Sequence, residues 1–167
     1  MTETAALIQS KLKAYRIIHL AMVMGSVVYG VVVVYIHQYA PIPPTITDVQ
    51  TVTMIEFALI FYIVGLLAAA AVTRKKMLNS DAIFKRRETA KEPLDQPPFI
   101  ANYLSSLFVV WALIEAITIG GIVLFLTSGK VMIPLIMISI AVLSKLANGP
   151  RREELRQLAA ADNSAAQ

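Results

Sequence analysis

The sequence of 167 residues contains no cysteine, two histidines and only 16% charged residues. Without cysteine there is no disulfide, no thiolate metal site and no cysteine nucleophile. The two histidines, His19 and His37, are 18 positions apart, or about 27 Å along a helix, so one helix cannot present both to a haem. No phosphate-binding loop, nucleophile–base pair or metal-ligand spacing is visible. The sequence argues against an enzyme and predicts no cofactor and no metal.

Hydrophobic residues are abundant, at 57%, and they are gathered into long runs. A helix needs about 20 apolar residues to cross about 30 Å of hydrocarbon. Four runs meet this description, at about residues 17–36, 52–72, 99–126 and 131–146. A lone strand in lipid would leave its backbone groups unpaired, so the valine-rich first run is also predicted to be helical. The predicted fold is an all-α integral membrane four-helix bundle.

The remaining segments are short and polar. Residues 1–16 are predicted to be an amphipathic lead-in on the inner membrane surface, before the transmembrane domain of residues 17–147. Between the second and third spans, Ser80 or Asp81 is predicted to cap a short helix. Residues 148–167 are predicted to be a polar tail whose Ala-rich end is frayed.

The basic residues predict the orientation of the spans. Fourteen of the 15 lysines and arginines precede the first span, lie between the second and third, or lie at or beyond the end of the fourth. Only Lys130 falls on the other side. Cytoplasmic loops are enriched in cations, so both termini are predicted to be cytoplasmic, in a bacterial inner membrane. The net charge of +4 is assigned to anionic lipid and not to nucleic acid.

Glu115 is the strongest candidate for a functional residue, because it lies in the middle of the third span. An unpaired carboxylate at that depth costs about 2.5–3.5 kcal/mol on insertion scales. Desolvation favours the protonated form, so Glu115 is expected to hold a proton near neutral pH and to release it when its surroundings change. Thr118, one turn further, is expected to donate a hydrogen bond on the same face. The structural alternative is a protonated Glu115 that only binds a neighbouring helix.

Two further charged residues lie nearer the ends of spans. Glu56 lies about one turn inside the second span, where a solvated carboxylate favoured by the helix dipole is expected. The alternative is an approach to Glu115 within about two turns in depth, which would form a proton entry relay. Lys145, near the end of the fourth span, is expected to extend its amine to the inner interface.

Glycines in the spans predict close helix contacts. Gly25 and Gly30 lie in the first span, and Gly120 and Gly121 in the third. Small residues let helices approach closely in lipid, so these positions are predicted to pack helices within the chain, in a homo-oligomer, or against other membrane subunits.

The stretch Ala112–Val123 resembles the carboxylate-bearing helix of the proteolipid (c) subunits of rotary ATPases. That family typically has the pattern A-L-x-E-A-x-x-I-Y-G-x-V here. The resemblance implies that Glu115 occupies the ion-carrying position and that Gly121 is the family glycine, with Gly120 in place of the usual tyrosine.

The resemblance is local. The glycine repeat of the family's inner helix is absent from the second span, and a 25-residue stretch replaces the family's short loop. The first span repeats part of the pattern at a shift of 91 residues, with Met24 in place of the carboxylate. One interpretation of this repeat is that the chain arose by duplication of a helical hairpin, followed by divergence. The chain is also similar to four-span bacterial inner-membrane proteins in general.

Two functions are predicted. The first is a small c-subunit-like membrane subunit that binds and carries a proton or sodium ion at Glu115 within a larger ion-translocating assembly. The second is a structural or accessory subunit of a respiratory, photosynthetic or transport complex, with no chemistry of its own.

Overall fold

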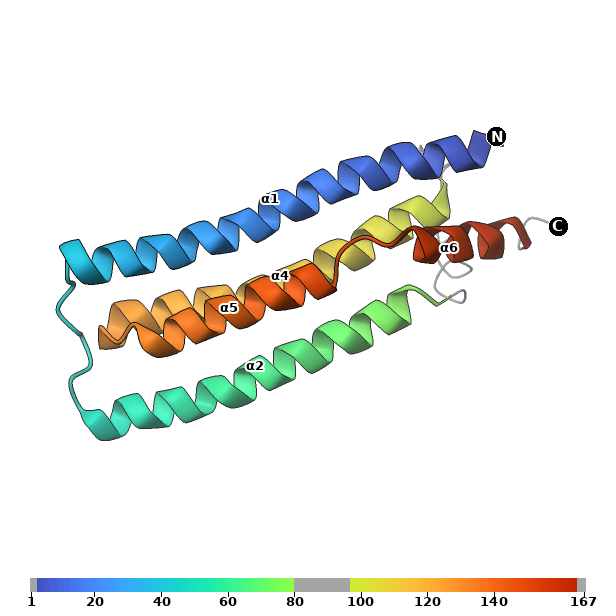
Figure 1. The fold of residues 1–167 in the computed structure, drawn as a ribbon. Coiled ribbons are helices and arrows are strands. Elements are labelled where there is room, and N and C mark those ends of the chain that lie inside the picture. The colour runs from blue at the N-terminus through green and yellow to red at the C-terminus, as the bar shows by residue number, and fades with distance from the viewer. Residues whose placement is uncertain (1–2, 80–96, 165–167) are drawn as a thin grey trace.

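A computed structural model describes residues 3–79 and 97–164, and this part of the chain is α-helical and has no strand. The helices are α1 (Glu3–Tyr39), α2 (Val49–Met77), α4 (Pro98–Ser128), α5 (Met132–Ala147) and α6 (Arg152–Ser164). The first four run side by side along one axis (Figure 1). Both termini lie at one end of these helices, called here the terminal end. The α1–α2 and α4–α5 connections lie at the other, the loop end (Figure 1). The predicted all-α class is confirmed.

Three of the helices, α1, α2 and α4, are long and apolar enough to cross a membrane. Helix α5 has 16 residues, about 24 Å, and forms a fourth candidate span only together with α6, across a bend of 51°. Pro150 explains the break between them, because proline lacks an amide proton and disfavours a helical residue before it. Residues 3–79 and 97–164 therefore contain three candidate spans, or four if the bent pair is one span.

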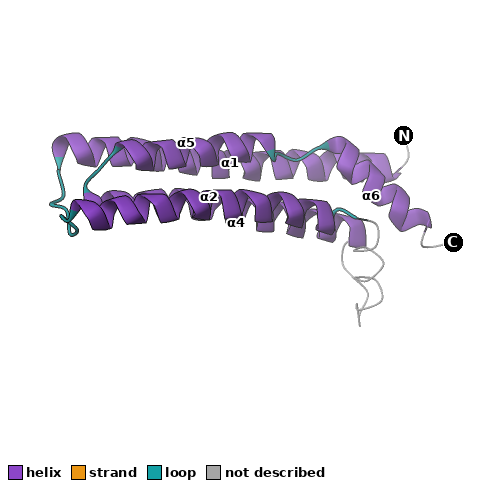
Figure 2. Cartoon of the chain, turned by 90° about the horizontal axis from the view of Figure 1, so that it is seen from below, coloured by secondary structure: helices purple, strands orange, loops and turns teal. Residues whose placement is uncertain are grey.

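Helix α4 is the centre of the fold. It contacts all four of the other helices, while α1 packs mainly on α5. Figure 2 shows α1 and α5 as one layer and α2 and α4 as the other. Fully buried side chains line α4 over most of its length, among them Leu107, Trp111, Ile114 and Ile117. Helix α2, in contrast, has few buried residues, so most of its surface faces away from the chain.

At the terminal end, the two segments that flank the predicted bundle are helical and pack against it. Residues 1–16 were predicted to be an amphipathic lead-in on the membrane surface; α1 is continuous from Glu3, and Ile8 and Leu12 are buried in the main core. Residues 148–167 were predicted to be a polar tail with a frayed end; residues 152–164 form α6, whose Leu155 and Leu158 belong to the same core. The physical reason is spacing. Apolar residues three or four positions apart give each segment one apolar face, and both faces join the core that also contains α4.

Residue type explains the end of α4 and the start of α2. Helix α4 ends at Gly129, whose φ of 69° is the left-handed conformation that glycine adopts without strain. Asp48 caps α2 by accepting a hydrogen bond from the Thr51 backbone N–H at 2.7 Å. The helix expected after Ser80 or Asp81 lies outside the described residues.

Candidate functional site

Polar side chains from three helices meet at one level of the fold. Glu115 lies 13 residues before the end of α4, Lys145 lies 13 residues after the start of α5, and Ser26 lies 13 residues before the end of α1. Each is therefore about 20 Å from the loop end at 1.5 Å per residue. Because neighbouring helices alternate in direction, equal distances from the loop end bring these residues together.

Lys145 is the centre of this group. Its side chain is fully buried, and its amine donates to Glu115 Oε2, to Ser26 Oγ at 2.6 Å and to the Met22 carbonyl oxygen at 3.2 Å. A lysine amine has three donors, so each has an acceptor here. The prediction that Lys145 extends to the interface is wrong, because the chain itself supplies a carboxylate and two further oxygens. The Glu115–Lys145 ion pair is called the central pair below.

Ser26 connects the central pair to Thr118. Its hydroxyl donates to Glu115 Oε2 at 3.3 Å and lies 3.5 Å from Thr118 Oγ1. Since Ser26 has one proton, which it gives to Glu115, Thr118 is the donor in the second contact. Thr118 was expected to contact Glu115 directly, and the structure instead places it one hydrogen bond away. Ser26 itself was not predicted, although its distance from the loop end matches that of Glu115.

Glu56 forms a second ion pair, nearer the loop end. Its Oε1 accepts from Lys130 Nζ at 2.8 Å, and this contact is called the loop-end pair. The Glu56 side chain is 19% exposed, so the carboxylate is partly accessible as well as paired. Among the described residues, no hydrogen bond joins Glu56 to Glu115, and each acid has its own lysine. The proton relay between the two acids therefore stays a prediction.

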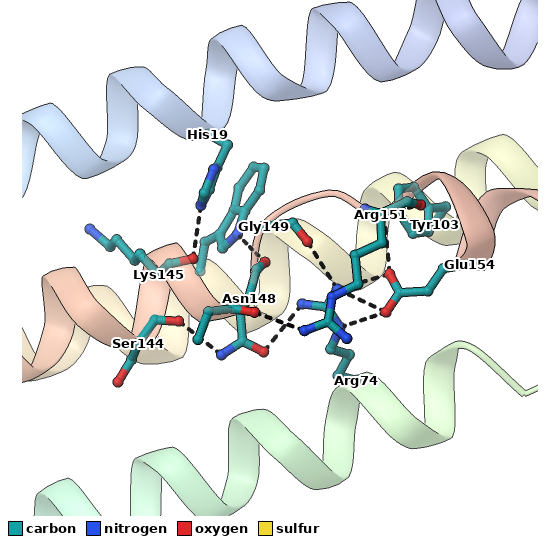
Figure 3. Close-up of polar contacts among 11 residues, drawn as sticks. His19, Arg74, Tyr103, Ser144, Lys145, Asn148, Gly149, Arg151 and Glu154 are labelled. Carbon is teal, nitrogen blue, oxygen red and sulfur yellow. Dashed lines mark hydrogen bonds and ion pairs between the residues drawn. The ribbon is translucent and has the colours of Figure 1, made fainter.

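A third ion pair lies toward the terminal end and was not predicted (Figure 3). Arg74 donates to both oxygens of Glu154, at 3.0 and 2.8 Å, which makes the terminal-end pair. The same guanidinium donates to Asn148 Oδ1 at 3.2 Å and to the Gly149 carbonyl at 3.1 Å. Tyr103 donates to Glu154 at 3.2 Å. Arg74 thus ties the end of α2 to the bend between α5 and α6.

His19 supports the same bend. Its Nε2 lies 2.8 Å from the Lys145 carbonyl oxygen, and its ring stacks on Trp111 with centroids 5.2 Å apart. Trp111 donates to the Asn148 carbonyl at 3.3 Å. These contacts satisfy carbonyls near the end of α5, where no further helical turn supplies partners. No group of three potential metal ligands occurs in residues 3–79 and 97–164.

The four glycines differ in what surrounds them. A Cβ at Gly121 would lie 3.2 Å from the Pro134 carbonyl oxygen, and one at Gly120 would lie 3.2 Å from a methionine methyl of α5. A Cβ at Gly30 would make an ordinary contact at 3.5 Å, and one at Gly25 would meet nothing within 4 Å. Gly120 and Gly121 therefore allow the close approach of α4 and α5. Packing at Gly25, if it occurs, needs a second chain and stays a prediction.

No protein family matches this chain, and no curated protein or solved structure matches it either.

Proposed function

We propose that this chain is a multi-pass subunit of a bacterial cytoplasmic membrane that assembles with other membrane chains and has no chemistry of its own. The observation that carries the proposal is the central pair. The acid in the middle of α4 is neutralised by a fully buried lysine of the same chain.

The central pair favours a structural role for the following reason. A carrier must change the charge of its carboxyl group during each cycle. Protonating Glu115 would leave the Lys145 ammonium buried without its counter-ion, and breaking a buried pair in this way costs about 3–5 kcal/mol. Lys145 is a permanent partner in the same chain, so it opposes such a cycle. Its contacts with Glu115 and Ser26 hold α1, α4 and α5 in one axial position relative to one another.

The distribution of cations supports an orientation with both termini in the cytoplasm. Arg16, at the terminal end, is exposed, as are Lys75, Arg152 and Arg156. Lys130 lies at the loop end. Cations concentrate on the cytoplasmic side of membrane proteins, so the terminal end is assigned to the cytoplasm.

The outer surfaces of α1 and α2 supply the faces for assembly. Their exposed side chains are large and apolar, including Ile17 at 62%, Phe57 at 61% and Phe61 at 77% exposure. In a bilayer such faces contact lipid or the helices of other subunits. Small residues such as Gly25 and Gly65, which have open space around them, allow a partner helix to come close.

A second candidate function, ion carriage at Glu115, is favoured by one observation. The Glu115 side chain keeps 24% of its surface exposed, so part of this side chain reaches the outside of the chain at mid-helix. A second subunit could reach it there, as the resemblance to rotary ATPase proteolipids implies.

The deciding experiment compares the wild type with the double variant Glu115→Gln, Lys145→Met in native membranes. The tagged chain is extracted in mild detergent and weighed by native mass spectrometry. An accessory subunit is expected in a hetero-complex of fixed stoichiometry, whose mass and activity the double variant preserves. A homo-oligomeric ring, or an intact complex that has lost ion coupling, would overturn the accessory role and support carriage. Glu56→Gln is the matched control, since it removes a different acid.

Carbodiimide labelling supplies an independent measurement. A hydrophobic carbodiimide adds to a protonated carboxyl group, so Glu115 paired with Lys145 is expected to react slowly. Lys145→Met is expected to raise the labelling. Rapid labelling of the wild type that sodium or high pH blocks would instead support ion carriage.

A further inference from the structure

A groove between α2 and α5 has one charged residue, Glu56, among the described residues that line it, and Glu56 lies at the part of the groove nearest the loop end. Its volume is about 540 Å³, within the range of about 300–1,000 Å³ of small-molecule sites. Apart from Glu56 the lining is apolar, mainly Phe57, Ile60, Val64, Ile133, Ile136 and Ile140. The groove therefore combines an apolar trough with a charged end.

The charges at this end have both signs. Glu56 pairs with Lys130 at 2.8 Å, with the lysine side chain 49% exposed. The lysine amine has three donors and gives one of them to Glu56 Oε1, so others are free to meet an anion. Glu56 Oε2 accepts no hydrogen bond from residues 3–79 or 97–164, and it is free to accept one from a cation. A ligand with adjacent negative and positive groups matches this arrangement.

The length of the groove matches one leaflet of a bilayer. Leu67, the last residue of α2 in the lining, is 11 positions after Glu56, or about 17 Å along the helix. Half of the hydrocarbon thickness is about 15 Å. An acyl chain whose headgroup lies at Glu56 and Lys130 would therefore end near the middle of the membrane.

We propose that this groove binds one phospholipid with a phosphoethanolamine headgroup. Its phosphate accepts from Lys130, its ammonium donates to Glu56, and one acyl chain lies between α2 and α5. Ethanolamine is preferred to choline, because a primary ammonium has N–H donors and a trimethylammonium has none. The site requires only that the helices lie in a membrane, and it is independent of the role of Glu115.

A second groove, between α1 and α5, provides the control. It measures about 710 Å³ and is also apolar, but among the described residues its lining has no charged side chain. It is expected to hold acyl chains without selecting a headgroup.

The test is native mass spectrometry of the full chain in mild detergent with phosphatidylethanolamine, phosphatidylcholine or phosphatidylglycerol of identical acyl chains. The wild type is expected to retain the ethanolamine lipid about threefold more than either other lipid, the size expected of one partly exposed ion pair. Glu56→Gln is expected to abolish that preference, and Lys130→Gln to lower retention of all three lipids.

Groove-filling variants test the acyl site separately. Ile136→Trp is expected to lower ethanolamine-lipid retention, while Val31→Trp, which fills the control groove, is expected to preserve the preference. Equal retention of ethanolamine and choline lipids by the wild type would overturn the proposal. Equal retention of phosphatidylglycerol and phosphatidylethanolamine by the wild type would also overturn it. So would an unchanged preference for phosphatidylethanolamine in a folded Glu56→Gln variant. If Glu56→Gln and Lys130→Gln fail to fold, the proposal is still tested by two measurements. These are the retention of the three lipids by the wild type and the retention of the ethanolamine lipid by Ile136→Trp.

Discussion

Replacing Lys145 by methionine tests the central pair most directly. Methionine keeps the length of the side chain and removes the ammonium that contacts Glu115, Ser26 and the Met22 carbonyl. Removing one partner of a buried pair costs about 3–5 kcal/mol. Because the Glu115 side chain is 24% exposed and keeps its hydrogen bond from Ser26, we expect the low end, about 3 kcal/mol.

The double variant Glu115→Leu, Lys145→Met is expected to regain most of this loss, since well-packed apolar residues replace buried ion pairs at little or no cost. The two single losses should therefore exceed the double loss by about 2 kcal/mol, which a double-mutant cycle resolves. Unfolding in detergent, followed by the fluorescence of Trp111, measures each variant. Trp111 is a suitable reporter because it stacks on His19, which bonds the Lys145 carbonyl.

The matched control is Lys130→Met in the loop-end pair. That lysine is half exposed, so its loss is expected to cost less than about 1 kcal/mol. Additive single losses at the central pair, or equal losses at the two lysines, would refute the argument that burial makes the central pair structurally important.

Other perturbations follow from the same contacts. Arg74→Met leaves Glu154 partly buried without its cation and is expected to lower hydrogen-exchange protection of α6 before that of α4. Gly121→Val is expected to cost about 1–3 kcal/mol in detergent unfolding, because its Cβ would lie 3.2 Å from a carbonyl oxygen of α5, whereas Gly25→Val, in open space, should cost little. Hydrogen bonds from the threonine three residues on hold the pKa of Asp48 below its usual value. Its contribution to stability is therefore complete above about pH 4 and is lost as the pH falls through the lowered native pKa, so Asp48→Ala should flatten the acid limb of thermal unfolding.

The long elements could be predicted because their signal is local. Runs of apolar residues predicted α1, α2 and α4. The end of α4 at Gly129 follows from the positive φ that glycine adopts without strain. The sequence did not show that α6 would continue the chain as a helix packed on α4 and α1, because this depends on apolar faces from distant segments coming together.

The ion pairs were harder to predict, for two different reasons. A lysine at the end of an apolar run normally extends toward water, and only the equal 13-residue distances from the loop end show that Lys145 lies level with Glu115. The predicted span ends at 126 and 131 give distances of 11 and 14 residues, so the sequence already placed the two residues within about one helical turn of each other. Arg74 had no such signal. It was one cation in a basic segment, and its partner Glu154 is 80 positions away in a helix that was not expected.

Taken together, the three ion pairs lie at three levels of the fold and join different elements. The loop-end pair joins α2 to the α4–α5 turn, the central pair joins α4 to α5, and the terminal-end pair joins α2 to α6. Lipid tails are as apolar as the helix surfaces, so burial of those surfaces provides little preference for one axial position of a helix over another. A shift of α2 along α4 by one turn, about 5.4 Å, would break the loop-end and terminal-end pairs together. Glu56 and Glu115, which the sequence offered as candidates for ion transfer, thus belong to a set of ion pairs that favours one register of helices whose apolar faces have little preference.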